Sequence, residues 1–293
     1  MSGQLKEVRT RIKSVGTTQQ ITKAMKMVSA AKLRRAQDAI TQMRPYAEKL
    51  QEMLGNIIGS LEGNMGGGLT VERPIEKVLF IVITSDRGLC GAFNANSIKL
   101  AKSVIKERYA DQHQKGNVHI LPLGKKAYES FERQGFKLVD DFWGIFSDLS
   151  FEAVRKVAEH VRAAFVRKEY DRVELVYSKF KNAATQEFIC EQHLPIPKSN
   201  SGKKQSNNDF IFEPSKEVLI QELMPKILNT QIYKGLLDSN ASEHGARMTA
   251  MDKATENAEE MLKTLKISYN RARQAAITTE LTEIVSGAAA LQG

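Results

Sequence analysis

The chain has 293 residues, of which 42% are hydrophobic and 26% are charged, enough apolar material for one or two folded domains. It contains no run of about 18 apolar residues, which excludes a membrane-spanning helix. The formal charge of +9 is uneven, because residues 1–50 carry eleven Lys or Arg and only three acidic residues. This excess admits nucleic acid, an anionic surface or an acidic protein cavity as a partner.

The first 62 residues are predicted to form one long helix, because apolar residues recur at spacings of three and four. The pattern has three parts along the chain. The first part is Leu5, Val8, Ile12 and Val15, and the second is Ile21, Met25 and Val28. The third is a heptad seam of Ala36, Ile40, Met43, Ala47, Leu50, Leu54, Ile57 and Leu61. Pro45 interrupts this pattern and predicts a kink or a short break, because an interior proline removes one helical hydrogen bond.

A glycine-rich linker, 63–68, separates this helix from a central α/β domain predicted over 75–197. The apolar run 78–84 is typical of a buried parallel strand. Strands and helices then alternate, which indicates a small doubly wound, Rossmann-like domain. The further strands are expected at 118–123, 173–180 and 187–191, and the helices at 94–108, 125–134 and 151–167.

Residues 198–213 are rich in Ser, Asn and Lys near their start and are predicted to form a flexible loop and a foot. The final segment, 214–293, repeats the heptad design of the first helix and predicts a second coiled-coil helix. Its seam residues are Met248, Met251, Thr255, Ala258, Leu262, Leu265, Tyr269, Ala272 and Ala276, and the apolar residues Ile277, Leu281, Ile284 and Val285 follow them. The alternative is a bundle of shorter stacked helices with breaks at Gly16, Pro45 and Gly235.

Helix lengths predict the topology. At 1.5 Å per residue the first helix would be roughly 85 Å long and the last roughly 115 Å. A domain of about 140 residues is less than about 40 Å wide, so it cannot return the chain along such a helix. The two helices must therefore run antiparallel, and the last one overhangs the first by roughly 30 Å. A lone helix is marginal in water, so this end is expected to lie inside a socket made by other proteins.

No motif for catalysis, cofactor binding or metal binding emerges. The segment Thr84–Asn94 follows the first strand, where α/β domains place ligands, but it has neither the Walker A lysine nor GxGxxG spacing. It is interpreted as a tight turn, with Asp86 or Arg87 tying down neighbouring loops. The five histidines show no paired spacing, and Cys190 with His193 has no second pair of ligands. Cys90 and Cys190 are read as buried thiols in a reducing compartment.

Three blocks of sequence carry a resemblance to a known family. They are ITKAMKMVSAAK at 21–32, TSDRGLCG at 84–91 and ARQAAITTELTEIVSGAA at 272–289. Together they resemble the gamma subunit of the F-type ATP synthase, and the match spans essentially the whole chain. The resemblance implies a non-catalytic central rotor stalk, which couples transmembrane proton flow to ATP synthesis or hydrolysis in a hexameric ring of alpha and beta subunits.

The resemblance also implies contact residues. Those expected to touch the alpha/beta ring are Met25, Arg247, Arg273, Gln274, Thr278 and Glu280. Those expected to form a foot on the membrane ring of c subunits are Arg44, Tyr46, Phe210, Phe212 and Glu213. An epsilon subunit is a further implied partner, no cofactor is expected, and membrane association is indirect. The N-terminus is basic and amphipathic, but Glu7 interrupts it, so a transit peptide is not favoured and a position on the cytoplasmic face of the bacterial plasma membrane is expected.

Two other function classes stay open at this point. A coiled-coil nucleic-acid-binding protein would use the basic face of the first helix, and its phosphate-neutralising residues would be Lys23, Lys26, Lys32, Arg34 and Arg35. The near absence of aromatic residues there argues against stacking on single strands. A nucleotide-using enzyme would use the central domain, although no residue in it has a nucleophile motif.

Overall fold

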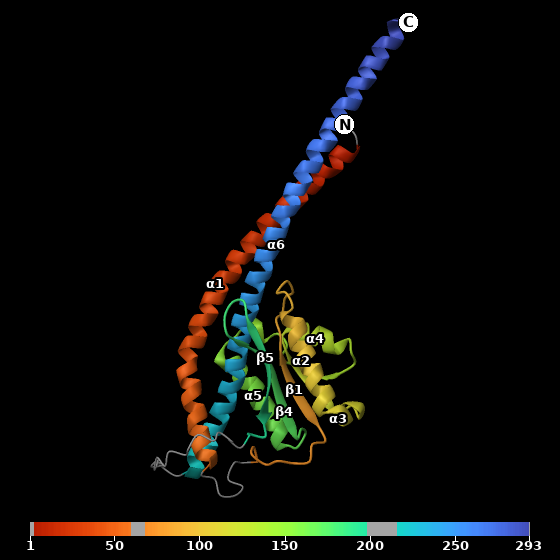
Figure 1. Ribbon diagram of the computed structural model, residues 1–293. Coiled ribbons are helices and arrows are strands. Elements are labelled where there is room, and N and C mark those ends of the chain that lie inside the picture. The colour runs from red at the N-terminus through yellow and green to blue at the C-terminus, as the bar shows by residue number, and fades with distance from the viewer. Residues whose placement is uncertain (1–2, 60–67, 198–215, 293) are drawn as a thin grey trace. The chain divides into compact units, whose positions relative to one another are not determined.

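The structure is a computed structural model that describes residues 3–59, 68–197 and 216–292 (Figure 1). The chain divides into two compact units. The first unit contains residues 1–29 and 248–293, and the second contains residues 30–247. The predicted linker at 63–68, except for Gly68, and the predicted loop and foot at 198–213 lie outside the described residues.

Two long helices form the ends of the chain. Helix α1 runs from Gly3 to Gly59 and α6 runs from Lys216 to Gln292. Of the kink or short break predicted at Pro45, the break is wrong, because α1 is helical on both sides of this residue. Buried Ala47 and Leu50 in the next turn stabilise the helix there and offset the hydrogen bond that proline removes. Both helices also continue through Gly16 and Gly235, so the alternative of shorter stacked helices is wrong as well.

In the first unit, α1 and α6 pack antiparallel. The Thr22 hydroxyl lies 2.8 Å from that of Thr255, and Lys26 pairs with Asp252, so the residue number rises on one helix as it falls on the other. On α6 the predicted seam is confirmed. Met251 and Ala258 are buried, and the other seam positions from Met248 to Ala276 are half-buried.

Two of the three residues predicted for the α1 seam between 21 and 28 are wrong, while the third, Met25, is half-buried. Ile21 and Val28 are 54% and 56% exposed, whereas the neighbouring Thr22 and Ser29 are buried. From Leu5 onward the four-and-three alternation continues without a shift through Val15 into this polar stretch. Helix geometry therefore keeps the buried face in phase and places hydroxyls in it, although apolar side chains are adjacent in sequence. The seam residues of this stretch are Gln19, Thr22, Lys26 and Ser29.

The second unit contains a five-stranded sheet in the order β3-β2-β1-β4-β5. Strands β1, β2, β3 and β4 run parallel and β5 is antiparallel to β4. The strands are β1 Val78–Ile83, β2 Val118–Leu123, β3 Lys137–Leu138, β4 Arg172–Phe180 and β5 Gln186–Leu194. All six residues of β1 are buried, which fits a central parallel strand covered on both faces.

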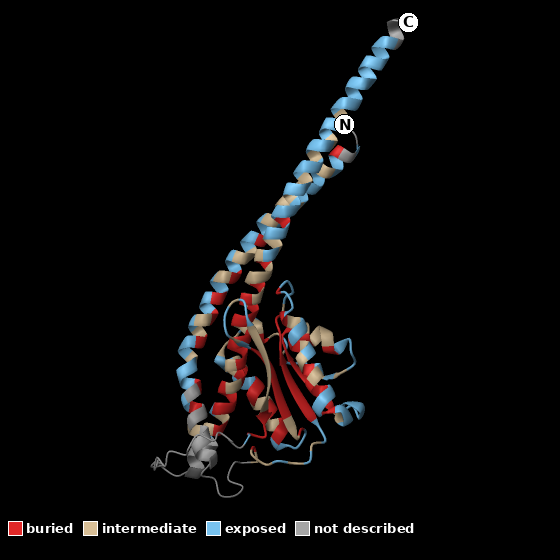
Figure 2. Ribbon diagram, viewed as in Figure 1, coloured by how far each residue is buried: buried red, intermediate tan, exposed pale blue. Residues whose placement is uncertain are grey.

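Helices cover both faces of this sheet. They are α2 Phe93–Arg108, α3 Ala110–Gln114, α4 Lys125–Glu132 and α5 Phe151–Val166, with a short 3-10 helix, η1, at Ile145–Ser147. Leu79, Ile81 and Ile83 pack on α5 and on the second-unit part of α6, and Val78, Phe80 and Val82 pack on α2 and α4. Figure 2 shows the resulting buried core in the sheet. The doubly wound central domain is confirmed, while β3, α3 and η1 were not predicted.

Candidate partner-binding surfaces and the turn after β1

The turn after β1 holds the first end of α4. The Thr84 hydroxyl accepts a hydrogen bond of 2.8 Å from the Ala127 amide, and Asp86 Oδ1 accepts one of 3.0 Å from the Lys125 amide. Both amides belong to the first turn of α4, where backbone donors have no partner within the helix. The side chains at the end of β1 therefore cap the helix that follows β2.

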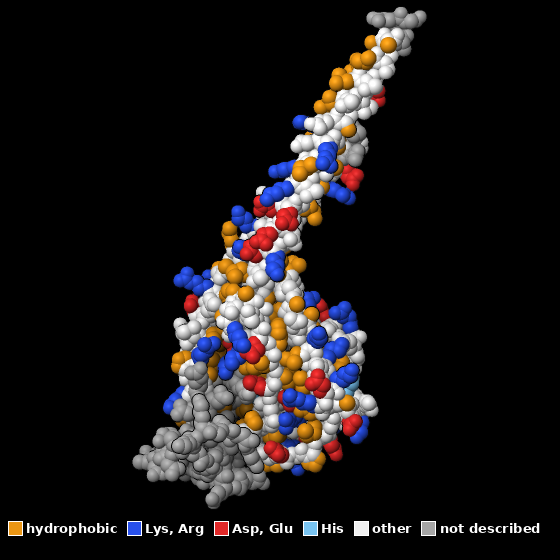
Figure 3. Space-filling model, viewed as in Figure 1, with side chains coloured by type: hydrophobic (Ala, Val, Ile, Leu, Met, Phe, Trp, Pro, Cys, Tyr) orange, Lys and Arg blue, Asp and Glu red, His pale blue; other side chains and the backbone are white. Residues whose placement is uncertain are grey.

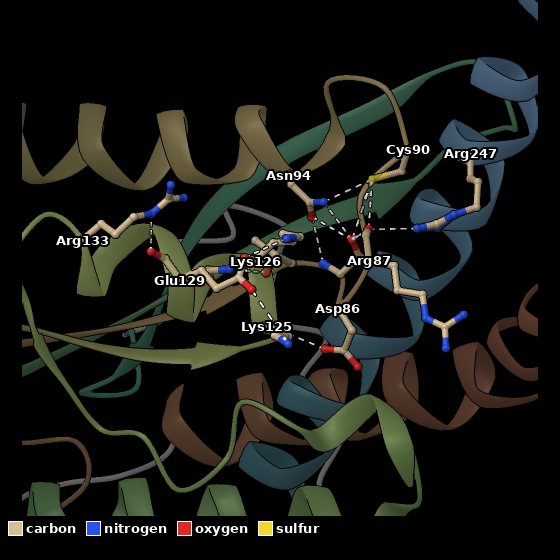
Figure 4. A network of polar contacts seen from close by, with 12 residues as sticks. Asp86, Arg87, Cys90, Asn94, Lys125, Lys126, Glu129, Arg133 and Arg247 are labelled. Atoms are coloured by element: carbon tan, nitrogen blue, oxygen red, sulfur yellow. Dashed lines mark hydrogen bonds and ion pairs between the residues drawn. The ribbon is translucent and has the colours of Figure 1, made fainter. Parts of the chain in front are cut away.

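A side-chain network fixes the turn itself (Figure 4). The Ser85 amide donates to Asn94 Oδ1 at 2.9 Å, and Asn94 Nδ2 donates to Ser85 Oγ at 2.8 Å and to Cys90 Sγ at 3.2 Å. Gly91 has a φ of 59° and Leu89 a φ of 63°, so the backbone passes twice through the left-handed region that favours glycine. The network stabilises this conformation, and Cys90 is a buried structural thiol.

Arg247 on α6 bonds to this turn. Its Nη2 donates to the carbonyl oxygens of Arg87 at 2.9 Å and Gly88 at 3.0 Å, and its Nη1 pairs with Glu243 one helical turn away. Arg247 is only 9% exposed. Burial raises the pKa of Glu243 above its usual range, and the Arg247 charge opposes that rise. Arg247 was predicted to touch the alpha/beta ring, but the contacts seen for its guanidinium lie within its own unit.

Several polar groups of this turn are used by the fold. Two of its carbonyl oxygens accept from Arg247, its hydroxyl and amide side chains bond to one another, and Asp86 caps α4. The arrangement therefore supports the interpretation as a tight turn that joins three elements, with Asp86 contributing its side chain and Arg87 its carbonyl oxygen.

The end of α6 presents most of the residues predicted to meet the ring. Arg273, Gln274, Thr278 and Glu280 are exposed, and Met25 on α1 is half-buried. Every residue from 277 to 289 is exposed, and the large apolar side chains among them are Ile277, Leu281, Ile284 and Val285, at 49–67% exposure. Figure 3 shows hydrophobic side chains along this end of the helix. Grouped exposed apolar side chains are typical of surfaces that bind a partner.

Two of the residues predicted for the foot can be placed. Arg44 and Tyr46 are exposed on the second-unit part of α1. Phe210, Phe212 and Glu213 lie outside the described residues. Of the five residues predicted to form the foot on the membrane ring, only these two on α1 therefore have a described position.

The polar layer between α1 and α6 was not predicted from the sequence. Lys26 and Asp252 form an ion pair across the seam, and Thr22 and Thr255 share a hydrogen bond. The available signal was the unbroken heptad phase from Leu5 to Leu50, which places Thr22, Lys26 and Ser29 on the buried face. The prediction followed the apolar side chains instead of the phase.

Neither a metal cluster nor a membrane-spanning helix is found where the chain is described. Over residues 3–59, 68–197 and 216–292, no three His, Cys, Asp or Glu side chains are arranged to hold a metal ion. None of the helices in these ranges has an apolar stretch long enough to cross a bilayer.

Comparison with known proteins identifies the family. A family model described as ATP synthase matches residues 4–291. The ATP synthase gamma chain of Cytophaga hutchinsonii is 56% identical over 290 residues, with 98% of each chain covered. That of Flavobacterium psychrophilum is 53% identical over 289 residues, with 99% of each chain covered.

Solved structures agree. The fold is similar to a chain of the Euglena gracilis mitochondrial ATP synthase structure of OSCP, F1 and c-ring, with a TM-score of 0.69 at 20% identity over 99% of this chain and 95% of that one. It is also similar to a chain of the Tetrahymena thermophila mitochondrial ATP synthase central stalk and c-ring, with a TM-score of 0.57 at 25% identity over 80% and 99%. By its sequence over nearly the full length, the chain belongs to the ATP synthase gamma family.

Proposed function

We propose that this chain transmits torque through the exposed end of α6 and through a foot on α1. As a gamma-family member it is a non-catalytic rotor-stalk subunit of a proton-transporting ATP synthase. The observation that carries the proposal is the run 277–289, which is wholly exposed and contains four large apolar side chains. A solvent-exposed single helix with such side chains is marginally stable unless a partner covers it. Family membership does not support the nucleic-acid-binding alternative.

The partner of this end is the hexameric ring of alpha and beta subunits. Met25, Arg273, Gln274, Thr278 and Glu280 are its contact residues, and all five are exposed or half-buried. Arg247 is proposed as a further ring contact, through the turn that its guanidinium bonds in the second unit. Only small residues occur from Ser286 to Ala290, and they allow a helix to turn against a smooth wall without interlocking.

The other partners are the epsilon subunit and the c-subunit ring of the membrane rotor. The foot consists of Arg44 and Tyr46 with Phe210, Phe212 and Glu213. We assign four functional segments to the chain. They are the coiled-coil helices at 1–62 and 214–293, the α/β domain at 75–197, and the loop and foot at 198–213. The complex associates with the membrane, and this chain lies on the cytoplasmic face of the plasma membrane.

Coupling follows from differential contact. A rotor without symmetry presents a different face to each catalytic subunit and so stabilises a different open or closed state in each. The free-energy difference between these contacts sets how far each population shifts. Catalysis belongs to the ring, and this chain only biases its states.

Truncation tests the end of α6. Deleting residues 279–293 from the assembled complex should weaken assembly or torque, because the apolar surface that the ring covers is lost. The α/β domain should remain folded, which fluorescence of the single tryptophan, Trp143, reports from the second unit. Full proton-coupled ATP synthesis by the truncated complex would refute the role of this end.

A charge substitution tests the α1 contact. Met25→Lys adds a cation at a half-buried position, where it would pair with acidic loops of the ring and hold one rotational state. Proton pumping should fall more than ATP hydrolysis does. Met25→Leu, which changes shape but not charge, is the matched control and should retain coupling. Unaltered pumping in Met25→Lys would show that this residue lies away from the ring.

A further inference from the structure

A pocket of about 590 Å³ lies in the second unit where α1, α6 and the β4–β5 hairpin meet. Basic side chains from all three elements line it: Arg44 from α1, Lys179 from β4, Lys181 from the turn that follows β4, and Lys234 from α6. Lys181 is paired with Glu187 at 3.1 Å. The cations outnumber the single lining acid, Asp238, so the pocket attracts an anion.

Asp238 supplies the second, independent observation. Its side chain lines the pocket and the residue is only 2% exposed. The carboxylate accepts a backbone hydrogen bond from Phe180, but its Oδ1 atom is buried and has no hydrogen-bond partner among the described atoms. A buried acceptor without a partner costs free energy, so such an atom points to a ligand with a donor.

The two observations together restrict the ligand. It must be an anion, to satisfy Arg44, Lys179 and Lys234, and it must also donate a hydrogen bond, to satisfy Oδ1. A carboxylate or a sulfate has negative charge but no donor at neutral pH. A phosphate group has both, because near neutral pH inorganic phosphate and phosphate monoesters retain a proton in part of the population.

We propose that this pocket binds a protonated phosphate group, whose charged oxygens contact Arg44, Lys179 and Lys234 and whose hydroxyl donates to Asp238 Oδ1. The site belongs wholly to the second unit and does not include the end of α6 that is proposed to meet the alpha/beta ring. Burial raises the pKa of Asp238, and Lys234, Arg44 and Lys179 oppose that rise. This supports a shared proton, because the proton affinities of carboxylate and phosphate become closer.

Two sources could supply such a group: inorganic phosphate in solution, or the phosphate monoester of phosphatidic acid at a membrane surface. For the first, the full chain is titrated calorimetrically with sodium phosphate and with sodium sulfate at equal ionic strength. For the second, it is incubated with vesicles that contain phosphatidic acid or phosphatidylglycerol, whose diester has no hydroxyl on phosphorus.

We expect phosphate to bind about tenfold more tightly than sulfate, as the loss of one charge-assisted hydrogen bond implies. Lys234→Gln should weaken phosphate binding about tenfold, while Lys115→Gln, an exposed lysine outside the pocket, should leave it unchanged. Asp238→Asn should remove the preference, because an amide can donate to sulfate and phosphate alike.

Preferential binding of phosphatidic acid vesicles that Lys234→Gln reduces would assign the lipid as the source. The proposal would be overturned if the unsubstituted chain bound phosphate and sulfate with equal affinity and also bound the two vesicle types equally. It would also be overturned if Lys234→Gln left phosphate and vesicle binding intact. Absence of binding in both arms would do the same. The comparison of phosphate with sulfate uses the unsubstituted chain. It therefore tests the proposal even if the Asp238→Asn variant does not fold.

Discussion

The hydroxyls of Thr22 and Thr255 lie 2.8 Å apart in the seam between α1 and α6 of the first unit. Each hydroxyl also lies near a carbonyl oxygen of its own helix, Thr22 at 3.0 Å from that of Gln19 and Thr255 at 2.7 Å from that of Met251. Because a hydroxyl has one proton, one threonine donates to its own helix while the other donates across the seam. One turn away, Lys26 pairs with Asp252. A polar layer in an apolar seam costs stability and fixes register.

This layer leads to the first prediction. Thr22→Val with Thr255→Val should leave the seam as stable or slightly more stable, because both partners are removed and valine keeps the shape. Thr22→Val alone should cost less than about 1 kcal/mol, since Thr255 keeps its own helical partner. Hydrogen exchange of the amides at 15–29 measures both effects. A loss of protection in the double variant would show that the hydroxyl pair contributes net stability.

The second prediction concerns Arg247. Arg247→Met leaves the Glu243 carboxylate, which is mostly buried, without its partner and should lower the free energy of unfolding by about 3 kcal/mol. Adding Glu243→Gln should recover part of that loss. Urea unfolding followed by Trp143 fluorescence gives the values. Arg155→Met, which breaks pairs of similar spacing with half-exposed Glu152 and Glu159, is the control and should cost under about 1 kcal/mol. Equal losses in the two variants would contradict the role given to Arg247.

The third prediction concerns the start of α4. Gly124 has a φ of +123°, and a Cβ there would lie 2.2 Å from the Thr84 carbonyl oxygen. Gly124→Ala should therefore combine backbone strain with a steric clash and cost at least about 3 kcal/mol. Gly116→Ala has a φ of +68° but open space around the added carbon, so it should cost only about 1 kcal/mol. Trp143 fluorescence again reports unfolding, and a similar cost at both sites would exclude the clash.

The fourth prediction is a pH dependence from His193. This residue is 1% exposed, and burial lowers its pKa to about 4, against the partial compensation of its hydrogen bond to Gln231. The unfolded chain binds a proton near pH 6.5, whereas the folded chain does so near pH 4. The stability that the neutral, buried His193 contributes is therefore fully present above pH 6.5. As pH falls from 6.5 toward 4, the free energy of unfolding drops by about 3 kcal/mol in total on account of this residue.

The matched variant is His193→Gln, which keeps an amide for Gln231 and does not titrate. Between pH 6.5 and pH 4 the unfolding free energy of the unsubstituted chain should fall more steeply than that of the variant. His244, whose pKa is also lowered by burial, is present in both chains and cancels in the difference. Parallel curves for the two chains would show that His193 is not the origin of the slope.

Much of the fold could be predicted from local patterns. Alternating strands and helices indicated the doubly wound sheet because the run Val78–Ile83 is apolar enough to be covered on both faces. The two end helices followed from long heptad repeats, and the antiparallel pairing followed from helix length alone. These properties depend on periodicity, which sequence carries directly.

The phase of α1 is also encoded in the sequence, because the unbroken heptad from Leu5 to Leu50 places Thr22 and Ser29 in the seam and leaves Ile21 and Val28 outside it. Only tertiary structure decided the rest. Arg247 meets carbonyl oxygens 159 and 160 residues away, and no local spacing encodes such a contact. The pocket of Asp238 likewise depends on three elements that are distant in sequence. Long-range packing, rather than pattern, determined where each of these side chains acts.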